Sequence, residues 1–148
     1  METWAGCALP TDREYDVTAD VWVKLEGRLA RVGMTDVAQT RMGRLVQLSW
    51  KAPGRTVERG RPLSVLESAK WVGPMISPLT GVIRENNRIA FDADVAVANR
   101  DPYERGWLYL IEPSKESELS ELIGGEAAVQ YYRELIDREG IQCFRCAE

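Results

Sequence analysis

Residues 62–81 read Pro62-Leu-Ser-Val-Leu66-Glu67-Ser68-Ala69-Lys70-Trp71-Val-Gly-Pro74-Met-Ile-Ser-Pro78-Leu-Thr-Gly81. Two apolar, β-prone runs, 62–66 and 74–77, flank a short polar joint, and this pattern predicts a β-hairpin. The hairpin places Lys70 at the turn, where it points towards solvent. Only four of the 19 basic residues are lysines. Lysine, unlike arginine, can lose its proton and form an amide, so Lys70 is a candidate attachment point for a covalent group.

Around this hairpin the sequence predicts further short strands separated by turn residues. Thr35 is a candidate N-cap for a short helix that ends near Thr40. We leave the segment around Asp92 and Asp94 without an assignment, because these two acids interrupt an apolar stretch. The expected strands are residues 21–25 and 28–32, joined at Glu26-Gly27, and then 45–50, 81–85 and 106–111.

Two helices are expected after the last strand. Ser114 caps a helix that runs to Gly124-Gly125, and a second helix begins near Glu126. Its apolar stripe consists of Ala128, Tyr131, Tyr132, Leu135 and Ile136, and Gly140 ends it. The chain is therefore expected to be mainly β with C-terminal helices. It forms one domain with a loose N-terminus (1–12), a β core (13–112), a helical segment (113–140) and a cysteine-containing tail (141–148).

Composition narrows the possible functions of these 148 residues. No apolar run approaches the ~20 residues that a membrane span needs, and the N-terminus lacks the pattern of a signal peptide, so we expect a cytoplasmic protein. The net charge of −4 argues against nucleic acid as a partner. The sequence has no histidine, which is the usual general base and the commonest metal ligand. We therefore expect neither a metal site nor independent catalysis.

Several spaced motifs occur in the order known from one family of small carrier proteins. The chain resembles the H-proteins of the glycine cleavage system, over roughly residues 13–137. The matching segments are Val32-Gly33-Met-Thr35-Asp36-Val-Ala38, Val57-Glu58-Arg59-Gly60, Glu67-Ser68-Ala69-Lys70, Ser77-Pro78-Leu-Thr80-Gly81, Asn99-Arg-Asp-Pro102-Tyr103-Glu-Arg-Gly106-Trp107 and Ser114-Lys-Glu116-Ser-Glu118-Leu119.

The resemblance implies a barrel-sandwich hybrid, the fold of lipoyl and biotinyl carriers, with lipoic acid attached to Lys70 as an amide. It also implies a non-catalytic carrier whose partners are a lipoate-attaching enzyme, dihydrolipoamide dehydrogenase and the enzymes of one complex. The attaching enzyme is expected to read Glu67, Ser68, Ala69, Trp71 and Gly81. Biotin carriers favour methionines on both sides of the lysine, and this chain has Ala69 and Trp71 there instead. Trp71 has two open roles, packing on the adjacent strand or forming a wall for the attached arm.

A basic stretch is expected beside the Lys70 turn. Its cations could form either an ordinary solvated face or a docking surface for an acidic partner. They are Arg41, Arg44, Lys51, Arg55, Arg59 and Arg61.

The chain departs from the glycine-cleavage pattern at several places. Asp20-Val21-Trp22 stands where the family usually has His-Glu-Trp, and Arg44, Ser49 and Lys51 replace acidic and proline positions. Cys143 and Cys146 form a C-x-x-C pair, which is half of a zinc site at most. The pair is either two incidental exposed thiols or a docking or redox feature.

These departures favour an H-like carrier in heterodisulfide-reductase-like sulfur oxidation, with the glycine cleavage system as the alternative. Two other classes stay open: an unmodified binding module that uses the basic 41–61 face, and an enzyme that uses Cys143 and Cys146 as a dithiol.

Overall fold

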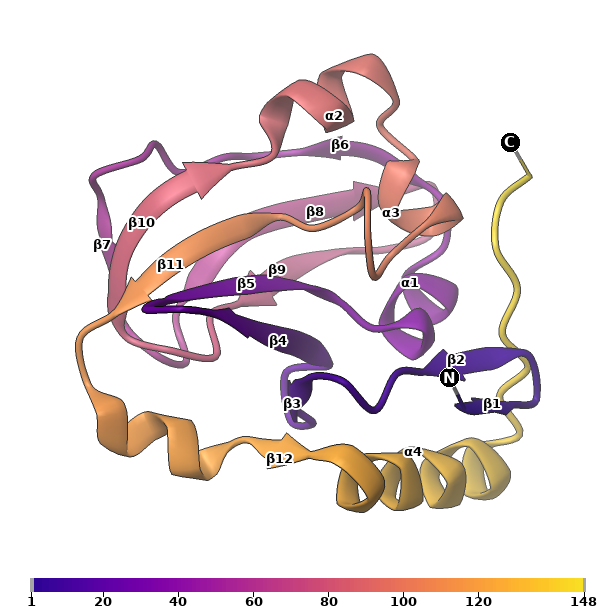
Figure 1. Ribbon diagram of the computed structural model, residues 1–148. Helices are drawn as coiled ribbons and strands as arrows, with labels where there is room; N and C mark the ends of the chain where they lie inside the picture. The colour runs from indigo at the N-terminus through magenta and orange to yellow at the C-terminus, as the bar shows by residue number, and fades with distance from the viewer. Residues whose placement is uncertain (1, 148) are drawn as a thin grey trace.

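In the computed structural model, which describes residues 2–147, the hairpin around Lys70 forms as its two apolar runs predict (Figure 1). Strand β8 (Pro62–Ser68) pairs antiparallel with β9 (Val72–Ile76), and the turn is confined to residues 69–71. Strand β6 (Leu45–Leu48) pairs with the other edge of β8. The three strands make a small sheet in the order β6-β8-β9.

A larger sheet carries seven strands in the order β12-β3-β4-β5-β11-β10-β7. The hairpin expected at Glu26-Gly27 is its centre, and each strand pairs antiparallel with its neighbours. The strands are β3 (Glu14–Asp16), β4 (Val21–Glu26), β5 (Leu29–Met34), β7 (Thr56–Val57), β10 (Gly81–Asn86), β11 (Tyr109–Pro113) and β12 (Ile123–Gly124).

The first half of strand β4 is buried on both faces, which explains its continuous apolar run Val21-Trp22-Val23. Val21 and Val23 face the core between the two sheets, whereas Trp22 faces a second apolar cluster on the outer side. The Trp22 indole donates a hydrogen bond to the Pro102 carbonyl at 3.0 Å. Gly33 on β5 leaves room for the indole, because a Cβ there would lie 2.6 Å from the ring. The expected mainly β, barrel-sandwich architecture is confirmed.

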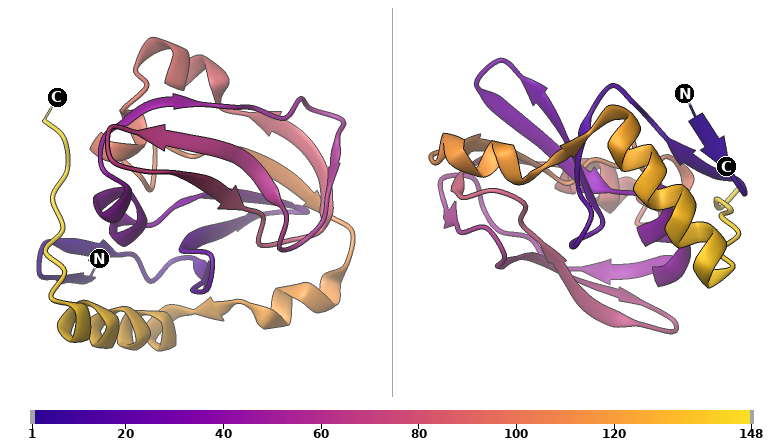
Figure 2. Two further views of the ribbon diagram at one scale, coloured as in Figure 1. Left: turned by 180° about the vertical axis from the view of Figure 1, so that it is seen from behind. Right: turned by 90° about the horizontal axis from the view of Figure 1, so that it is seen from below.

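Helix α4 (Gly125–Glu139) covers the second cluster and packs against β1 (Glu2–Trp4), β3 and β12, at the β12–β3 edge of the large sheet (Figure 2). It ends, as predicted, at Gly140, whose φ of 64° is left-handed. Tyr132, Leu135 and Ile136 are buried as the stripe predicts, but Tyr131 is exposed.

The prediction of a helix from Ser114 to Gly124 is wrong. Residues Glu116–Glu121 form only a 3₁₀ helix, followed by β12. The carboxylate of Glu118 accepts hydrogen bonds from the backbone N–H and the hydroxyl of Thr80, at 2.7 and 2.8 Å. These bonds hold the segment beside the start of β10. The 3₁₀ helix has no buried residue, so it has no apolar face with which to stabilise a longer helix.

The prediction of a loose N-terminus is also wrong. Strands β1 (Glu2–Trp4) and β2 (Cys7–Leu9) form a hairpin, and Cys7 and Leu9 are buried. The N–H of Ala8 donates to the carboxylate of Asp36 at 2.8 Å, and its carbonyl accepts the Tyr103 hydroxyl at 2.7 Å. The hairpin is therefore fixed by residues far along the chain, which local sequence does not reveal.

Helix α1 (Asp36–Met42) begins where the sequence predicts. The Thr35 side chain accepts a hydrogen bond from the Ala38 N–H at 3.1 Å. The unassigned segment contains α2 (Arg88–Ala93) and α3 (Val97–Arg100), and Phe91 of α2 packs edge-on against Trp50. Within residues 2–147, no helix combines the length and the apolar character that crossing a membrane requires.

Candidate functional site

The Lys70 turn is anchored from below by Ser68. The Ser68 N–H donates to the Trp71 carbonyl at 2.8 Å and closes the turn. The Ser68 hydroxyl, which is buried, donates to the Met42 carbonyl at 2.6 Å and accepts from the Lys70 N–H at 3.3 Å. The turn is thereby tied to the C-terminal end of α1, while Ala69, Lys70 and Trp71 stay exposed.

Gly43 forms the floor beneath the lysine side chain. It ends α1 with φ 87° and ψ −176°, a backbone conformation that only glycine adopts readily. A Cβ at this position would lie 2.9 Å from Cε of Lys70, so the lysine stem lies directly on the glycine. The Gly43 carbonyl accepts a hydrogen bond from the Asn99 side chain at 2.9 Å, which fixes the floor to α3. In the described chain, the Lys70 ammonium forms no ion pair.

Trp71 packs on its own strand and lines a cleft, while its role as a wall for the attached arm stays a prediction. Its ring lies over Gly73, where a Cβ would be 2.2 Å from the indole, so the side chain packs on its own strand. Trp71 also lines a cleft of about 340 Å³ next to the turn. The cleft is walled mainly by apolar side chains, including Met34, Met42 and Met75, and its charged members are Asp20 and Arg41.

Asp20 and Arg41 join this cleft to α4. Burial raises the pKa of Asp20, against the lowering effects of the Tyr132 hydroxyl and Arg41. The Tyr132 hydroxyl donates to Asp20 at 3.0 Å, and Arg41 approaches the same carboxylate at 3.7 Å. Arg41 also pairs with Glu139 at the end of α4. Sequence reasoning missed Asp20 as a member of this site, because its partners lie on distant elements.

The geometry is that of one lysine presented on a rigid turn beside an apolar cleft. A family model described as the glycine cleavage H-protein matches residues 13–135. The chain belongs to the glycine cleavage H-protein family. Members of the family are non-catalytic carriers that hold lipoic acid as an amide on a lysine. The resemblance noted in the motifs is thus confirmed at the level of the family, and the sulfur-oxidation subtype is not.

Similar H-proteins are found in bacteria and archaea. The chain is 39% identical over 145 residues to glycine cleavage system H protein 2 of Aquifex aeolicus, covering 97% of this chain and 89% of that one. It is 41% identical over 148 residues to the probable glycine cleavage system H protein 2 of Sulfolobus acidocaldarius, covering 98% and 99%. The crystal structure of an H protein from Mycobacterium marinum is similar, with a TM-score of 0.72 and 33% identity over 90% of this chain and all of that one.

The residues expected to guide attachment in this H-protein-family chain do not all lie at the turn. Glu67 is half-buried on β8, opposite Val72 and one residue before Ser68. Gly81 is instead buried at the start of β10, where a Cβ would lie 2.2 Å from the Glu112 carbonyl oxygen. The close approach of the β11 backbone therefore explains why residue 81 is a glycine, without direct recognition by an enzyme.

The basic stretch is not one surface beside Lys70, contrary to expectation. Only Arg41 and Arg44 lie at the Lys70 end, and Arg41 is already paired. Arg59 and Arg61 lie at the opposite end of the hairpin, where Gly60 and Arg61 bond to Ser77. The seven residues of β8 separate the two ends by roughly 20 Å. Arg44, Lys51, Arg55, Arg59 and Arg61 have no ion pair within residues 2–147.

The cysteines are not two incidental exposed thiols, which was one of the two expectations for the C-x-x-C pair. Cys143 is buried and forms a disulfide with Cys7, and Cys146 is the free cysteine. The sequence alone paired Cys143 with its neighbour because their spacing is short, whereas the fold brings Cys7 to it across 136 residues. No cluster of three metal-ligating side chains occurs in residues 2–147.

Proposed function

We propose that Lys70 is the lipoyl-bearing lysine and that the chain carries bound intermediates between the enzymes of one complex. The supporting observation is the exposed Lys70 stem on the Gly43 floor, in a turn that Ser68 pins to α1. The three other lysines lack this setting. Lys24 pairs with Asp12, and Lys51 is half-buried. Lys115 is exposed but precedes the 3₁₀ helix and does not lie on a β-turn. A rigid tip defines one acceptor amine for the attaching enzyme.

The attached group would supply the chemistry, through two sulfurs that interconvert between disulfide and dithiol. The protein supplies placement. Ser68 and Gly43 hold the base of the arm, and its length raises the effective concentration of the sulfurs at a docked enzyme. Trp71 and the methionine-lined cleft offer an apolar surface beside the attachment point.

The mass of the intact protein from its native host tests this assignment. We expect a lipoyl-sized increment that Lys70→Arg abolishes. Lys115→Arg is the matched control, because Lys115 is also exposed, and it should keep the increment. An increment that survives in Lys70→Arg would refute the assignment, and an unmodified wild type would favour the binding-module alternative.

For the complex, we infer a glycine-cleavage-type assembly, in which the carrier receives an aminomethyl group. The family match and the names of the relatives support this inference. Two of the features that favoured sulfur oxidation, Cys143 and Ser49, have structural roles. Cys143 is tied to Cys7, and the Ser49 hydroxyl accepts the Val65 N–H at 2.8 Å to close β6 onto β8. Arg44 is the changed charge that stays exposed beside the turn.

Capture of partners by the lipoylated chain tests this inference, with Lys70→Arg as the control. Glycine decarboxylase and aminomethyltransferase subunits are the expected partners, together with dihydrolipoamide dehydrogenase. Capture of heterodisulfide-reductase-like subunits in their place would overturn the glycine-cleavage inference and restore the sulfur-oxidation hypothesis.

A further inference from the structure

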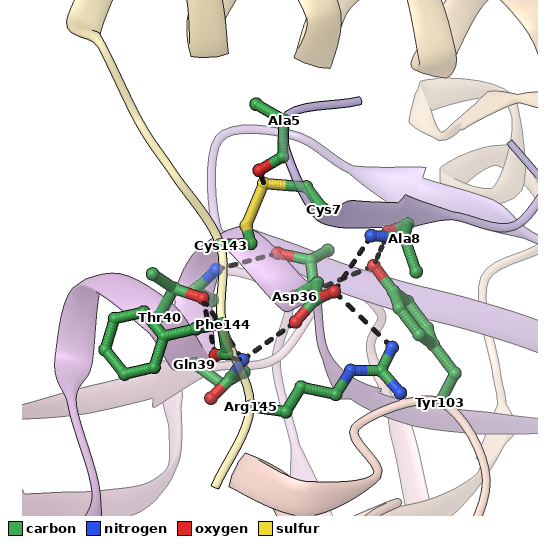
Figure 3. Close-up of a disulfide and its surroundings, with 12 residues drawn as sticks. Ala5, Cys7, Ala8, Asp36, Gln39, Thr40, Tyr103, Cys143, Phe144 and Arg145 are labelled. Carbon is green, nitrogen blue, oxygen red and sulfur yellow. Dashed lines mark hydrogen bonds and ion pairs between the residues drawn. A yellow bond between two sulfur atoms is a disulfide. The ribbon is translucent and has the colours of Figure 1, made fainter. Parts of the chain in front are cut away.

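The C-terminal tail, residues 141–147, is held against the body of the protein by a disulfide. After α4 the tail runs extended past the β1–β2 hairpin and α1, without helix or strand (Figures 1 and 3). Cys143 is bonded to Cys7, and the Cys143 N–H donates to the Ala5 carbonyl at 3.0 Å. Both bonded cysteines are buried.

Beyond the disulfide, the tail makes a small number of contacts. The Phe144 carbonyl accepts from the Gln39 side chain at 2.9 Å, and Arg145 approaches the buried carboxylate of Asp36 at 3.4 Å (Figure 3). The Cys146 N–H donates to the Asn99 carbonyl at 3.1 Å. The Phe144 ring is 68% exposed, so it adds little apolar anchoring. A segment with so few buried contacts opens at low free-energy cost.

The residues that receive the tail also support the lysine turn. Asn99 accepts from the Leu45 N–H and donates to the Gly43 carbonyl, both at 2.9 Å. Gln39 and Asn99 contact each other at 3.2 Å. Gly43 is the floor under Lys70. The tail is thus two contacts away from the Lys70 site.

The third cysteine of the chain lies on the same tail as Cys143. Cys146 is the free cysteine, is half-buried, and follows Cys143 by three residues. Because the Cys7–Cys143 bond is buried, a reductant in solution reacts with it slowly while the tail is closed. A thiol on the tail itself reaches the bond whenever the tail loosens, at high effective concentration.

We propose that Cys146 opens the Cys7–Cys143 disulfide, which acts as a redox clasp on the tail. The Cys146 thiolate attacks Sγ of Cys143, the bond to Cys7 breaks, and Cys7 leaves as a thiolate that takes up the proton lost by Cys146. This exchange is redox-neutral. A small dithiol then reduces the exposed Cys143–Cys146 disulfide. The small dithiol is oxidised to a cyclic disulfide, and its two electrons and two protons pass to Cys143 and Cys146.

Opening the clasp frees the tail and exposes the α1 side of the site. Without the Cys146 and Phe144 contacts, Gln39 and Asn99 lose part of their restraint, so the floor at Gly43 becomes more mobile. The oxidised chain therefore holds its lysine turn more rigidly than the reduced chain.

The kinetics of reduction test the role of Cys146. The full chain with Lys70→Arg is treated with dithiothreitol without denaturant and quenched with N-ethylmaleimide at successive times. Intact-protein mass spectrometry then gives the number of alkylated thiols. This background excludes any lipoyl group, so the result is independent of the proposed carrier function. Reduction should slow by about tenfold or more in Cys146→Ser, because the effective concentration of a tethered thiol is lost. Gln142→Ser, another exposed tail position, should react at the parental rate. Equal rates for Cys146→Ser and its parent, or a disulfide that resists until the core unfolds, would overturn the proposal.

Amide hydrogen exchange tests the clasp itself. Reduction should accelerate exchange at the Cys143 and Cys146 amides by about tenfold or more, and it should also accelerate exchange at Leu45 and Lys70. The Ile83 amide, which donates to the Arg55 carbonyl at the far end of the sheet, should not change. Cys143→Ser, which cannot close the clasp, should match the reduced chain. Protection that persists at Cys146 and Leu45 after reduction would contradict the clasp.

Discussion

At the scale of single residues, the lysine site depends on a glycine that has two separate reasons to be a glycine. Gly43 has a positive φ, and its missing Cβ is the space that the Lys70 stem uses. Neither reason can be read from the local sequence. The motif places Lys70 at a turn, but the floor comes from a residue 27 positions earlier.

Gly43→Ala should harm both stability and lipoyl attachment. The positive φ should cost about 1–3 kcal/mol of unfolding free energy, measured by urea denaturation. The new Cβ also displaces the lysine stem, so attachment by the lipoate-attaching enzyme should slow. Gly54→Ala is the matched control, because Gly54 has φ 92° and no neighbour within 4 Å of a built Cβ. It should lose stability but keep the attachment rate. Equal attachment by both variants would contradict the role of Gly43.

At the scale of elements, α1 is the support on which the lysine turn rests. Its N-terminal end is capped by Thr35, and its C-terminal end receives Ser68 through the Met42 carbonyl. A helix of seven residues is too short to be stable alone, so its caps and tertiary contacts carry its stability.

Thr35→Ala should destabilise the protein by about 1 kcal/mol, because the Ala38 N–H loses its cap acceptor. Thermal or urea denaturation measures the loss. Thr18→Ala removes an exposed threonine hydroxyl that forms no hydrogen bond in the described chain, so it should stay within about 0.5 kcal/mol of wild type. A Thr35→Ala protein as stable as Thr18→Ala would show that α1 does not depend on this cap.

The elements that sequence predicts well are those specified by their own residues. The 26–27 hairpin, the lysine hairpin, the Thr35 cap and the Gly140 stop all depend on neighbours within a few positions. The failures depend on distant partners. The N-terminal hairpin is fixed by Asp36 and Tyr103, and the segment 114–124 is held by Thr80.

The candidate site divides in the same way. The attachment motif around Lys70 is local and can be recognised, and its family follows from the order of the motifs. The cleft beside it combines side chains from β4, β5, α1, β8 and β9, so only the fold assembles it. The basic stretch failed for the opposite reason, since residues close in sequence are spread along the length of β8.

At the scale of the whole molecule, Asp20 links three layers: the start of β4, helix α1 through Arg41, and α4 through Tyr132. It has a positive φ of 58°, which aspartate and asparagine tolerate better than most residues. Asparagine at this position therefore keeps the backbone and a hydrogen-bond acceptor for Tyr132, and removes only the charge.

Asp20→Asn should change how stability depends on pH. Because burial raises the pKa of Asp20, the folded state holds its proton more tightly than the unfolded state does. The resulting stabilisation is present below the unfolded pKa and is lost as the pH rises through the folded pKa. Wild type should therefore gain stability relative to Asp20→Asn as the pH falls from 7 to about 4, measured by urea denaturation of both proteins. Asp12→Asn should show the opposite sign, because a hydrogen bond from Arg13 lowers the pKa of Asp12. A pH-independent difference between wild type and Asp20→Asn would mean that Asp20 titrates alike in the folded and unfolded chains.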